Sequence, residues 1–203
     1  MFHVKQFEEK LYKYKELLSR YHKTLDLMSD KGLKDLDAKI DDVRVFATQI
    51  KSLKSENTNI LDIGSGAGLP GVVLAILLPN WRISLVERRQ RRASFLTIVK
   101  SQLALSNVEI FNTDVKDLKL EPQAVISAQA VTDFYSLYCL SRQVHCQKIT
   151  LISRKGDGWQ DEIDYIKAKI DKNITVHATQ ELSNDGNLVT ISLVGGKKCQ
   201  LSE

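Results

Sequence analysis

The chain has 203 residues, 43% of them hydrophobic, which suits one globular domain with a small appendage. Its net charge of +4 at pH 7 permits a nucleic-acid partner without requiring one. No apolar run reaches the roughly 18 residues that span a bilayer, and the N-terminus lacks the apolar stretch of a secretory signal. Three scattered cysteines and four histidines without metal-ligand spacing indicate neither disulfides nor a metal site. We therefore expect a cytoplasmic protein without membrane attachment or bound metal, and we expect it to be a monomer.

The N-terminal region has the pattern of helices. Apolar residues recur every three or four positions between residues 7 and 25, which predicts an amphipathic helix. A polar break, "SDKG", follows, and a second, weaker helix is predicted over 35–53. The polar stretch 54–57 has the composition of a linker. We therefore divide the chain into a helical cap, 1–57, and a main domain, 58–203.

Strand-like and helix-like segments alternate after the linker. Strands are predicted at 59–63, 82–87, 108–112, 124–127, 148–153 and 187–194. Helices are predicted up to residue 78, where Pro79 ends the segment, and over 89–105, 131–140 and 161–170. This alternation predicts an α/β fold: a doubly wound, mostly parallel sheet of the Rossmann-like type, with helices on both faces.

The segment "LDIGSGAGLPG", residues 61–71, joins a predicted buried strand to a helix and contains four glycines. Glycines at such a turn let the backbone approach a ligand closely. "GAGLPG" fits the dinucleotide pattern GxGxxG, which would indicate a dehydrogenase. "LDIGSGAG" fits the acidic residue and GxGxG of methyltransferases that use S-adenosylmethionine (AdoMet). A turn without any ligand is the third interpretation, although four glycines would then cost backbone entropy to no purpose.

Three features favour the AdoMet interpretation. Gly64 directly follows the strand, whereas the dinucleotide pattern starts two residues later. Asp62 suits the ammonium group of a methionine moiety and would repel a pyrophosphate. Pro70 removes an N–H group where a pyrophosphate needs donors. We therefore predict that the cofactor contacts Asp62 and the loop residues Gly64, Gly66 and Gly68.

Two further segments fit a nucleoside. Glu87 ends the second predicted strand, where a carboxylate accepts hydrogen bonds from both ribose hydroxyls. An acidic residue at a strand end is also common on protein surfaces. The turn "NTDVKDL" follows the third strand and would border the adenine ring through Asp114 or through the backbone of Val115 and Lys116. Without the glycine loop, the same turn would be an ordinary polar loop.

A basic segment, "ERRQRR", opens the predicted helix 89–105. The helix dipole disfavours cations at a helix start, so an anion should compensate them. An RNA phosphate is one candidate, and the alternative is solvated arginines partly paired with Glu87. The predicted RNA-binding residues are Arg88, Arg91, Arg92, Arg154 and Lys155.

The motifs "DIGSGAGLPG", "SLVERRQRRASFL" and "RKG" together resemble those of the bacterial small-subunit rRNA guanine-N7 methyltransferases, also called glucose-inhibited division protein B. The resemblance is strongest over 59–118. It implies AdoMet as cofactor, 16S rRNA or the small ribosomal subunit as partner, and methylation of a guanine N7. It also implies that Gly64 and Leu69 contact the cofactor, that the Val115–Lys116 pair holds adenine, and that Lys155 faces the RNA or the target base as a catalytic residue.

The sequence departs from the family pattern at several positions. The family's arginine in "SRA", a cofactor or catalytic position, corresponds to Ala128 in "SAQ". The family's asparagine aligns with Asp26, and its "RHxxDS" run reads "AKIDDV" at 38–43. These departures support a second hypothesis, in which the chain is a degenerate AdoMet-binding, RNA-binding assembly factor that transfers no methyl group.

Overall fold

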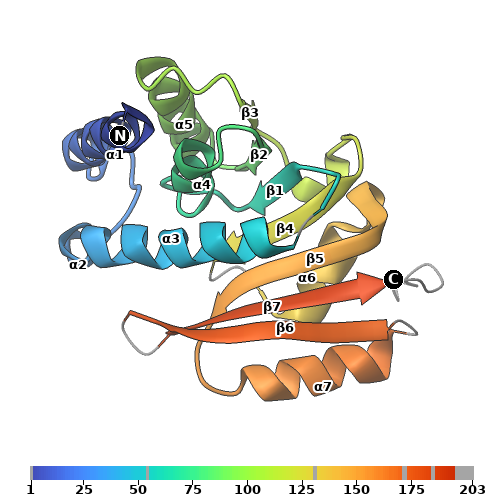
Figure 1. Ribbon diagram of the computed structural model, residues 1–203. Helices are drawn as coiled ribbons and strands as arrows, with labels where there is room; N and C mark the ends of the chain where they lie inside the picture. Colours follow the sequence, from blue (N-terminus) through green and yellow to red (C-terminus); the bar gives the residue numbers. More distant parts are fainter. Residues whose placement is uncertain (1, 54, 130–131, 171–172, 184–185, 195–203) are drawn as a thin grey trace.

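A computed structural model describes residues 2–53, 55–129, 132–170, 173–183 and 186–194. Their centre is a seven-stranded sheet with the order β3-β2-β1-β4-β5-β7-β6 (Figure 1). The strands are β1 (Asn59–Ile63), β2 (Arg82–Val86), β3 (Val108–Phe111), β4 (Gln123–Gln129), β5 (His145–Lys155), β6 (Asn173–Leu182) and β7 (Gly186–Val194). β1 to β5 pair in parallel, whereas β7 pairs antiparallel with both β5 and β6. The strand order reverses direction between β1 and β4, which places the expected ligand crevice at their carboxyl ends.

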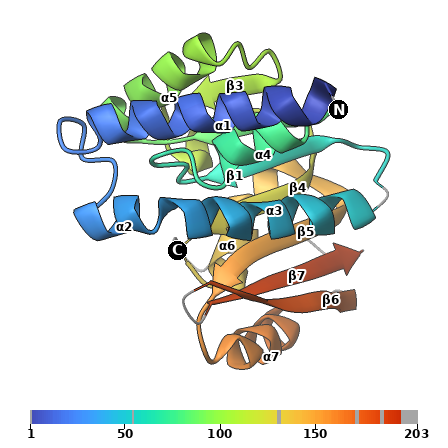
Figure 2. The ribbon, with the colours of Figure 1, turned by 60° about the vertical axis from the view of Figure 1, so that its left-hand side comes forward.

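Helices cover both faces of this sheet (Figures 1 and 2). One face carries α3 (Leu36–Ser52), α4 (Gly71–Leu77) and α5 (Gln90–Gln102), and α1 (Phe2–Tyr21) lies along α4 and α5. The other face carries α6 (Phe134–Leu140) and α7 (Trp159–Lys169). Short pieces complete the set: α2 (Asp30–Lys34), η1 (Val115–Asp117) and η2 (Arg142–Val144).

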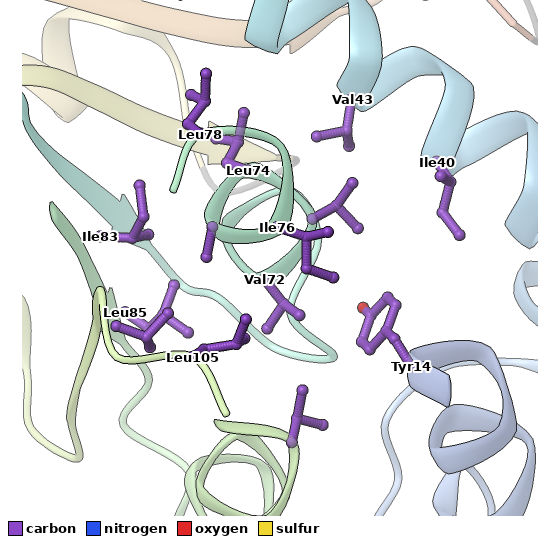
Figure 3. Packing of buried hydrophobic residues seen from close by; sticks show 14 of the residues in the cluster. Tyr14, Ile40, Val43, Val72, Leu74, Ile76, Leu78, Ile83, Leu85 and Leu105 are labelled. Carbon is purple, nitrogen blue, oxygen red and sulfur yellow. The ribbon is translucent and has the colours of Figure 1, made fainter. Parts of the chain in front are cut away.

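Each face of the sheet has its own hydrophobic core. Successive side chains of a strand point to opposite faces, so Ile60 belongs to the first core and Leu61 to the second. The first core also takes in residues from the predicted cap: Tyr14, Ile40 and Val43 lie around α4 (Figure 3). The cap helices therefore bury their apolar faces against the main domain. The division at residue 57 itself stays a prediction.

Most predicted elements are present, and the differences have local causes. The "SDKG" break is the start of α2, because the Ser29 hydroxyl accepts a hydrogen bond from the Gly32 N–H and caps a helical turn. The predicted strand–helix alternation fails at the C-terminal end. There, β6 was not predicted, and it forms an antiparallel pair with β7 without an intervening helix. The mostly parallel, doubly wound sheet is confirmed.

Two absences hold for the part of the chain that the structure describes. No helix within it is long and apolar enough to cross a membrane. No three or more of its His, Cys, Asp or Glu side chains gather in a group that could hold a metal ion.

Candidate functional site

A cavity of about 530 Å³ lies at the carboxyl ends of β1, β2 and β4. Five of the predicted cofactor residues are among those that line it: Gly64, Glu87, Asp114, Val115 and Lys116. They come from the glycine loop, the end of β2 and the turn after β3. The topology thus brings together three segments that the sequence connects only by pattern, at the place where open α/β sheets bind their ligands.

The glycine loop wraps over the end of β2. The N–H groups of Gly64 and Ser65 both donate to the Val86 carbonyl, at 2.9 and 3.1 Å. Gly64 and Gly66 have φ angles of 72° and 54°, in the left-handed region that side chains other than glycine rarely adopt. The glycines therefore serve the path of the loop as well as close approach to a ligand.

Glu87 organises this loop from the side of β2. The residue is 5% exposed, and its Oε2 accepts from the Gly66 N–H at 3.0 Å and its Oε1 from the Arg89 N–H at 2.8 Å. Asn112 fixes its backbone by donating to the Glu87 carbonyl at 2.8 Å. The carboxylate is held in one orientation at the cavity wall and is not an exposed strand-end acid.

Asp62 lies beneath the loop and does not line the cavity. It is 1% exposed, and its Oδ1 accepts a hydrogen bond from the Ser127 hydroxyl at 2.7 Å. Gly71 lies close to the other carboxylate oxygen, since a Cβ at Gly71 would be only 2.6 Å from Oδ2. Oδ2 itself makes no hydrogen bond of normal geometry. Burial raises the pKa of Asp62 to about 6, against the opposing effect of the Ser127 hydrogen bond. The backbone N–H of Gly71 also favours the charged form of this carboxylate. The contact of Asp62 with a cofactor ammonium stays a prediction.

The turn after β3 is built to present its backbone. The Asp114 carboxylate accepts from the Lys116 N–H at 3.0 Å and caps η1. Gln143, in η2, donates its side-chain N–H to the Val115 carbonyl. Asp114 is therefore engaged in shaping the turn. Gln143 was not predicted, because nothing in the sequence links it to a turn 28 residues away.

Four other predicted cofactor residues are not part of the cavity lining: Gly66, Gly68, Leu69 and Ala128. A Cβ at Gly68 would lie 2.6 Å from a Val72 methyl, so this glycine allows α4 to pack against the loop. Leu69 packs against the first core. Ala128 is fully buried in β4, where the next residue, Gln129, lines the cavity. Because successive residues of a strand point to opposite faces, the alternation in β4 could have indicated that Gln129, and not Ala128, lines the cavity.

The arginines at the start of α5 have an unpredicted anionic partner. The Nε of Arg92 donates to the Asp26 carbonyl at 2.9 Å, and its Nη2 lies 3.5 Å from the Asp26 carboxylate. Arg89 also approaches that carboxylate, at 3.8 Å. Arg88 and Arg91 are exposed. The cap thus supplies the compensating negative charge for Arg92. Arg88, Arg89 and Arg92 line the cavity, and Arg91 is exposed outside its lining.

Arg154 and Lys155, at the end of β5, are both engaged within the protein. The Arg154 guanidinium pairs with the buried Asp42 of α3. Lys155 is 8% exposed, and its Nζ lies 2.7 Å from the Glu162 carboxylate and 4.5 Å from the centre of the Phe134 ring. An RNA contact by either residue would require these interactions to open, and both predicted roles stay predictions.

Comparison with known proteins identifies the family. The model of the family "rRNA small subunit methyltransferase G" (GidB) matches residues 7–189. Several bacteria have proteins named ribosomal RNA small subunit methyltransferase G whose sequences are similar to this chain. The protein from Brachyspira hyodysenteriae is 28% identical over 91% of this chain and 90% of its own length. The one from Campylobacter jejuni is 34% identical over 81% and 85%, respectively.

Solved structures show the same fold at low sequence identity. Magnesium protoporphyrin IX methyltransferase from Synechocystis PCC 6803, solved with bound SAM, has a TM-score of 0.63 and 12% identity, covering 90% of this chain and 97% of its own. A SAM-dependent methyltransferase from Aquifex aeolicus has a TM-score of 0.58 and 18% identity, covering 82% and 100%. The chain has the fold of class I AdoMet-dependent methyltransferases, and it belongs to the rRNA small subunit methyltransferase G family.

Proposed function

We propose that this chain transfers a methyl group from AdoMet to N7 of a guanine in 16S rRNA of the small ribosomal subunit. The observation that carries the proposal is the cavity at the strand-order switch. It is walled by the glycine loop, by the fixed Glu87 carboxylate and by the turn at Val115. Family membership supports the substrate, since the relatives are named for small-subunit ribosomal RNA.

The residues around the cavity fit AdoMet. A carboxylate offers about four lone-pair sites, so Glu87 can accept from both ribose hydroxyls while it keeps its two backbone hydrogen bonds. The backbone of Val115 and Lys116 would hold the adenine edge, and Gly64 would lie along the methionine part. Asp62 would stabilise its ammonium group. When bound, AdoMet supplies a methyl group activated by a positively charged sulfur.

The proposed methyl transfer requires little acid–base catalysis by the protein. Guanine N7 carries a free lone pair and loses no proton on methylation, so no general base is required. The sequence after β4, "SAQA", also lacks the Asn/Asp-Pro-Pro-aromatic motif used for exocyclic amines. The protein's contribution is then the proximity and alignment of the base with the methyl group.

We propose that exposed Arg88 and Arg91 bind RNA phosphates beside this cavity. Arg88 lines the cavity together with Arg89 and Lys116, and Arg91 is exposed in the first turn of α5. Arg154 and Lys155 would support the site indirectly, because their interactions hold α3 and the start of α6 against β5. Because the proposed substrate is small-subunit rRNA, we further propose action in the cytoplasm, as a monomer; light scattering during size-exclusion chromatography would measure its mass.

A transfer assay tests the function. Purified protein is incubated with tritiated AdoMet and either 30S subunits or naked 16S rRNA lacking the modification, and 7-methylguanosine is measured by mass spectrometry. We expect incorporation at one guanine, and none with Gly64→Val, whose side chain would be strained at a φ of 72°. AdoMet binding with no transfer to either substrate would support the degenerate assembly factor, which Ala128 in place of the family's arginine favours.

A further inference from the structure

A buried tyrosine of the N-terminal region reaches the glycine loop. Tyr14, in α1, is fully buried, and its hydroxyl donates to the Ala67 carbonyl at 2.8 Å, across 53 residues of sequence. Figure 3 shows its ring pointing from α1 toward Val72 at the start of α4. Burial raises the pKa of the Tyr14 hydroxyl, with the Asp62 charge adding to the effect. The hydroxyl therefore stays protonated and remains a donor.

Arg92 of α5 connects the turn after α1 to the neighbourhood of the same loop. Arg92 donates to the Asp26 carbonyl, and an alanine Cβ at Gly66 would lie 3.9 Å from the Arg92 Nη1. Asp26 holds this position with a φ of 51° and pairs with Arg92 through its carboxylate. The N-terminal segment thus contacts the loop directly at Ala67, and Asp26 acts near Gly66 only through Arg92.

The loop is held on its other side by the main sheet. Gly64 and Ser65 bond to Val86, and the Gly66 N–H bonds to Glu87. These bonds fix the N–H groups at the start of the loop, and the Tyr14 hydroxyl fixes the peptide that follows. A peptide held at both ends keeps its donors aimed in one direction, which lowers the cost of binding a ligand.

We propose that Tyr14 is a positioning residue for the cofactor, assisted by Asp26 through Arg92, so that the N-terminal helical segment forms part of the AdoMet site. The inference rests on the proposed function. Removal of the hydroxyl leaves the Ala67 carbonyl without its buried donor, and the loop then shifts to satisfy it elsewhere.

Tyr14→Phe tests the hydroxyl, and Tyr21→Phe is its matched control. Tyr21 ends the same helix and packs edge-on against Phe95, with ring centroids 6.2 Å apart. Isothermal titration with AdoMet is expected to give about a tenfold rise in Kd for Tyr14→Phe and no change for Tyr21→Phe. The KM for AdoMet should rise similarly, whereas kcat and the KM for the 30S subunit stay near wild type, because the loss falls on cofactor binding.

Urea unfolding separates positioning from a purely structural role. A lower unfolding midpoint with unchanged AdoMet affinity would make Tyr14 an ordinary core residue and overturn the proposal. If Tyr14→Phe does not fold, Asp26→Asn removes the ion pair with Arg92 from an exposed side chain and keeps the hydrogen bond to the Asp26 carbonyl; about a twofold rise in Kd is expected, and an unchanged Kd would overturn the proposal. Wild-type protein that binds no AdoMet would instead refute the proposed function itself.

Discussion

At the scale of single residues, Glu87 shows how one carboxylate serves both the loop and a ligand. Its two oxygens each accept one backbone N–H, from Gly66 and from Arg89. Those bonds hold the side chain at the cavity wall before any ligand arrives. The side chain is therefore preorganised for a ligand. A substitution that keeps its shape but alters its donors and acceptors should weaken ligand binding.

Glu87→Gln is expected to weaken AdoMet binding at least tenfold. An amide has a single acceptor oxygen, so its NH2 group must face the N–H of either Gly66 or Arg89. Isothermal titration would measure the loss. Glu109→Gln, on the neighbouring strand β3 and exposed, is the control and should bind like wild type. Equal affinities for Glu87→Gln and wild type would remove Glu87 from the site.

Asp62 makes the stability of the protein depend on pH. Burial raises its folded pKa from 3.8 to about 6, so its stabilising contribution is present below pH 4 and is lost as the pH rises through 6. The shift corresponds to on the order of 3 kcal/mol. Urea unfolding from pH 4 to 8 should show a steeper decline for wild type than for Asp62→Asn. Parallel profiles for the two proteins would contradict the shift.

Local pattern predicted the residues at strand ends but not the partners of the basic side chains. Gly64, Glu87 and Val115 follow from their places after successive strands, because topology brings such positions together. Arg92 meets Asp26 from 66 residues away, and Arg154 meets Asp42 from 112. Such pairs depend on how the cap docks, and the spacing of charges in the sequence carries no information about it.

At the scale of elements, one polar network joins α3 to the C-terminal half of the sheet. The Asp42 carboxylate accepts from Arg154 and, at 2.8 Å, from both the N–H and the hydroxyl of Ser183, which follows β6. Gly186 leaves room for it, since a Cβ there would lie 2.4 Å from the guanidinium. The network therefore fastens a cap helix, β5 and the β6–β7 connection at one point.

Arg154→Leu is expected to lower the free energy of unfolding by about 2–4 kcal/mol, because it leaves the buried Asp42 charge without its partner. Chemical denaturation measures this loss of unfolding free energy. Arg44→Ala, which breaks exposed ion pairs of α3 with Glu8 and Asp41, should cost about 1 kcal/mol or less. Similar losses for both variants would mean that the network adds no more than a surface pair does.

Periodicity predicted the helices and the central strands, and it failed at β6. The apolar residues of "NITVHATQEL" alternate with polar ones, which is a strand signal, but they are few and partly exposed. The regular alternation of strand and helix before it favoured a further helix–strand unit. The antiparallel insertion of β7 between β5 and β6 is a tertiary pairing, which no local period encodes.

At the scale of the whole molecule, the cap and the sheet share one core. Tyr14, Leu18, Phe46 and Ile50 are all fully buried in the same cluster as the apolar residues of α4. The sequence predicted an amphipathic N-terminal helix but could not say what its apolar face would cover. In the structure that face covers the helix that follows the glycine loop.

Removal of residues 1–57 is expected to leave a protein that does not fold on its own. The truncation exposes the apolar face of α4, whose residues Val72 to Ile76 are buried in the intact chain. We expect aggregation during size-exclusion chromatography and a loss of the cooperative thermal transition seen by circular dichroism. A monomeric, cooperatively unfolding 58–203 fragment would instead establish two independent domains.

The irregular register of β6 has a consequence for the edges of the sheet. β6 is the last strand on its side, and its pairing with β7 shifts between Val176 and Ala178. An edge strand offers free backbone groups to any chain able to extend the sheet, and a bulge interrupts that row. A second molecule that aligned along β6 would lose its ladder halfway. The same irregularity that interrupts the β6–β7 pairing therefore makes β6 a poorer template for edge-to-edge association between copies of the chain.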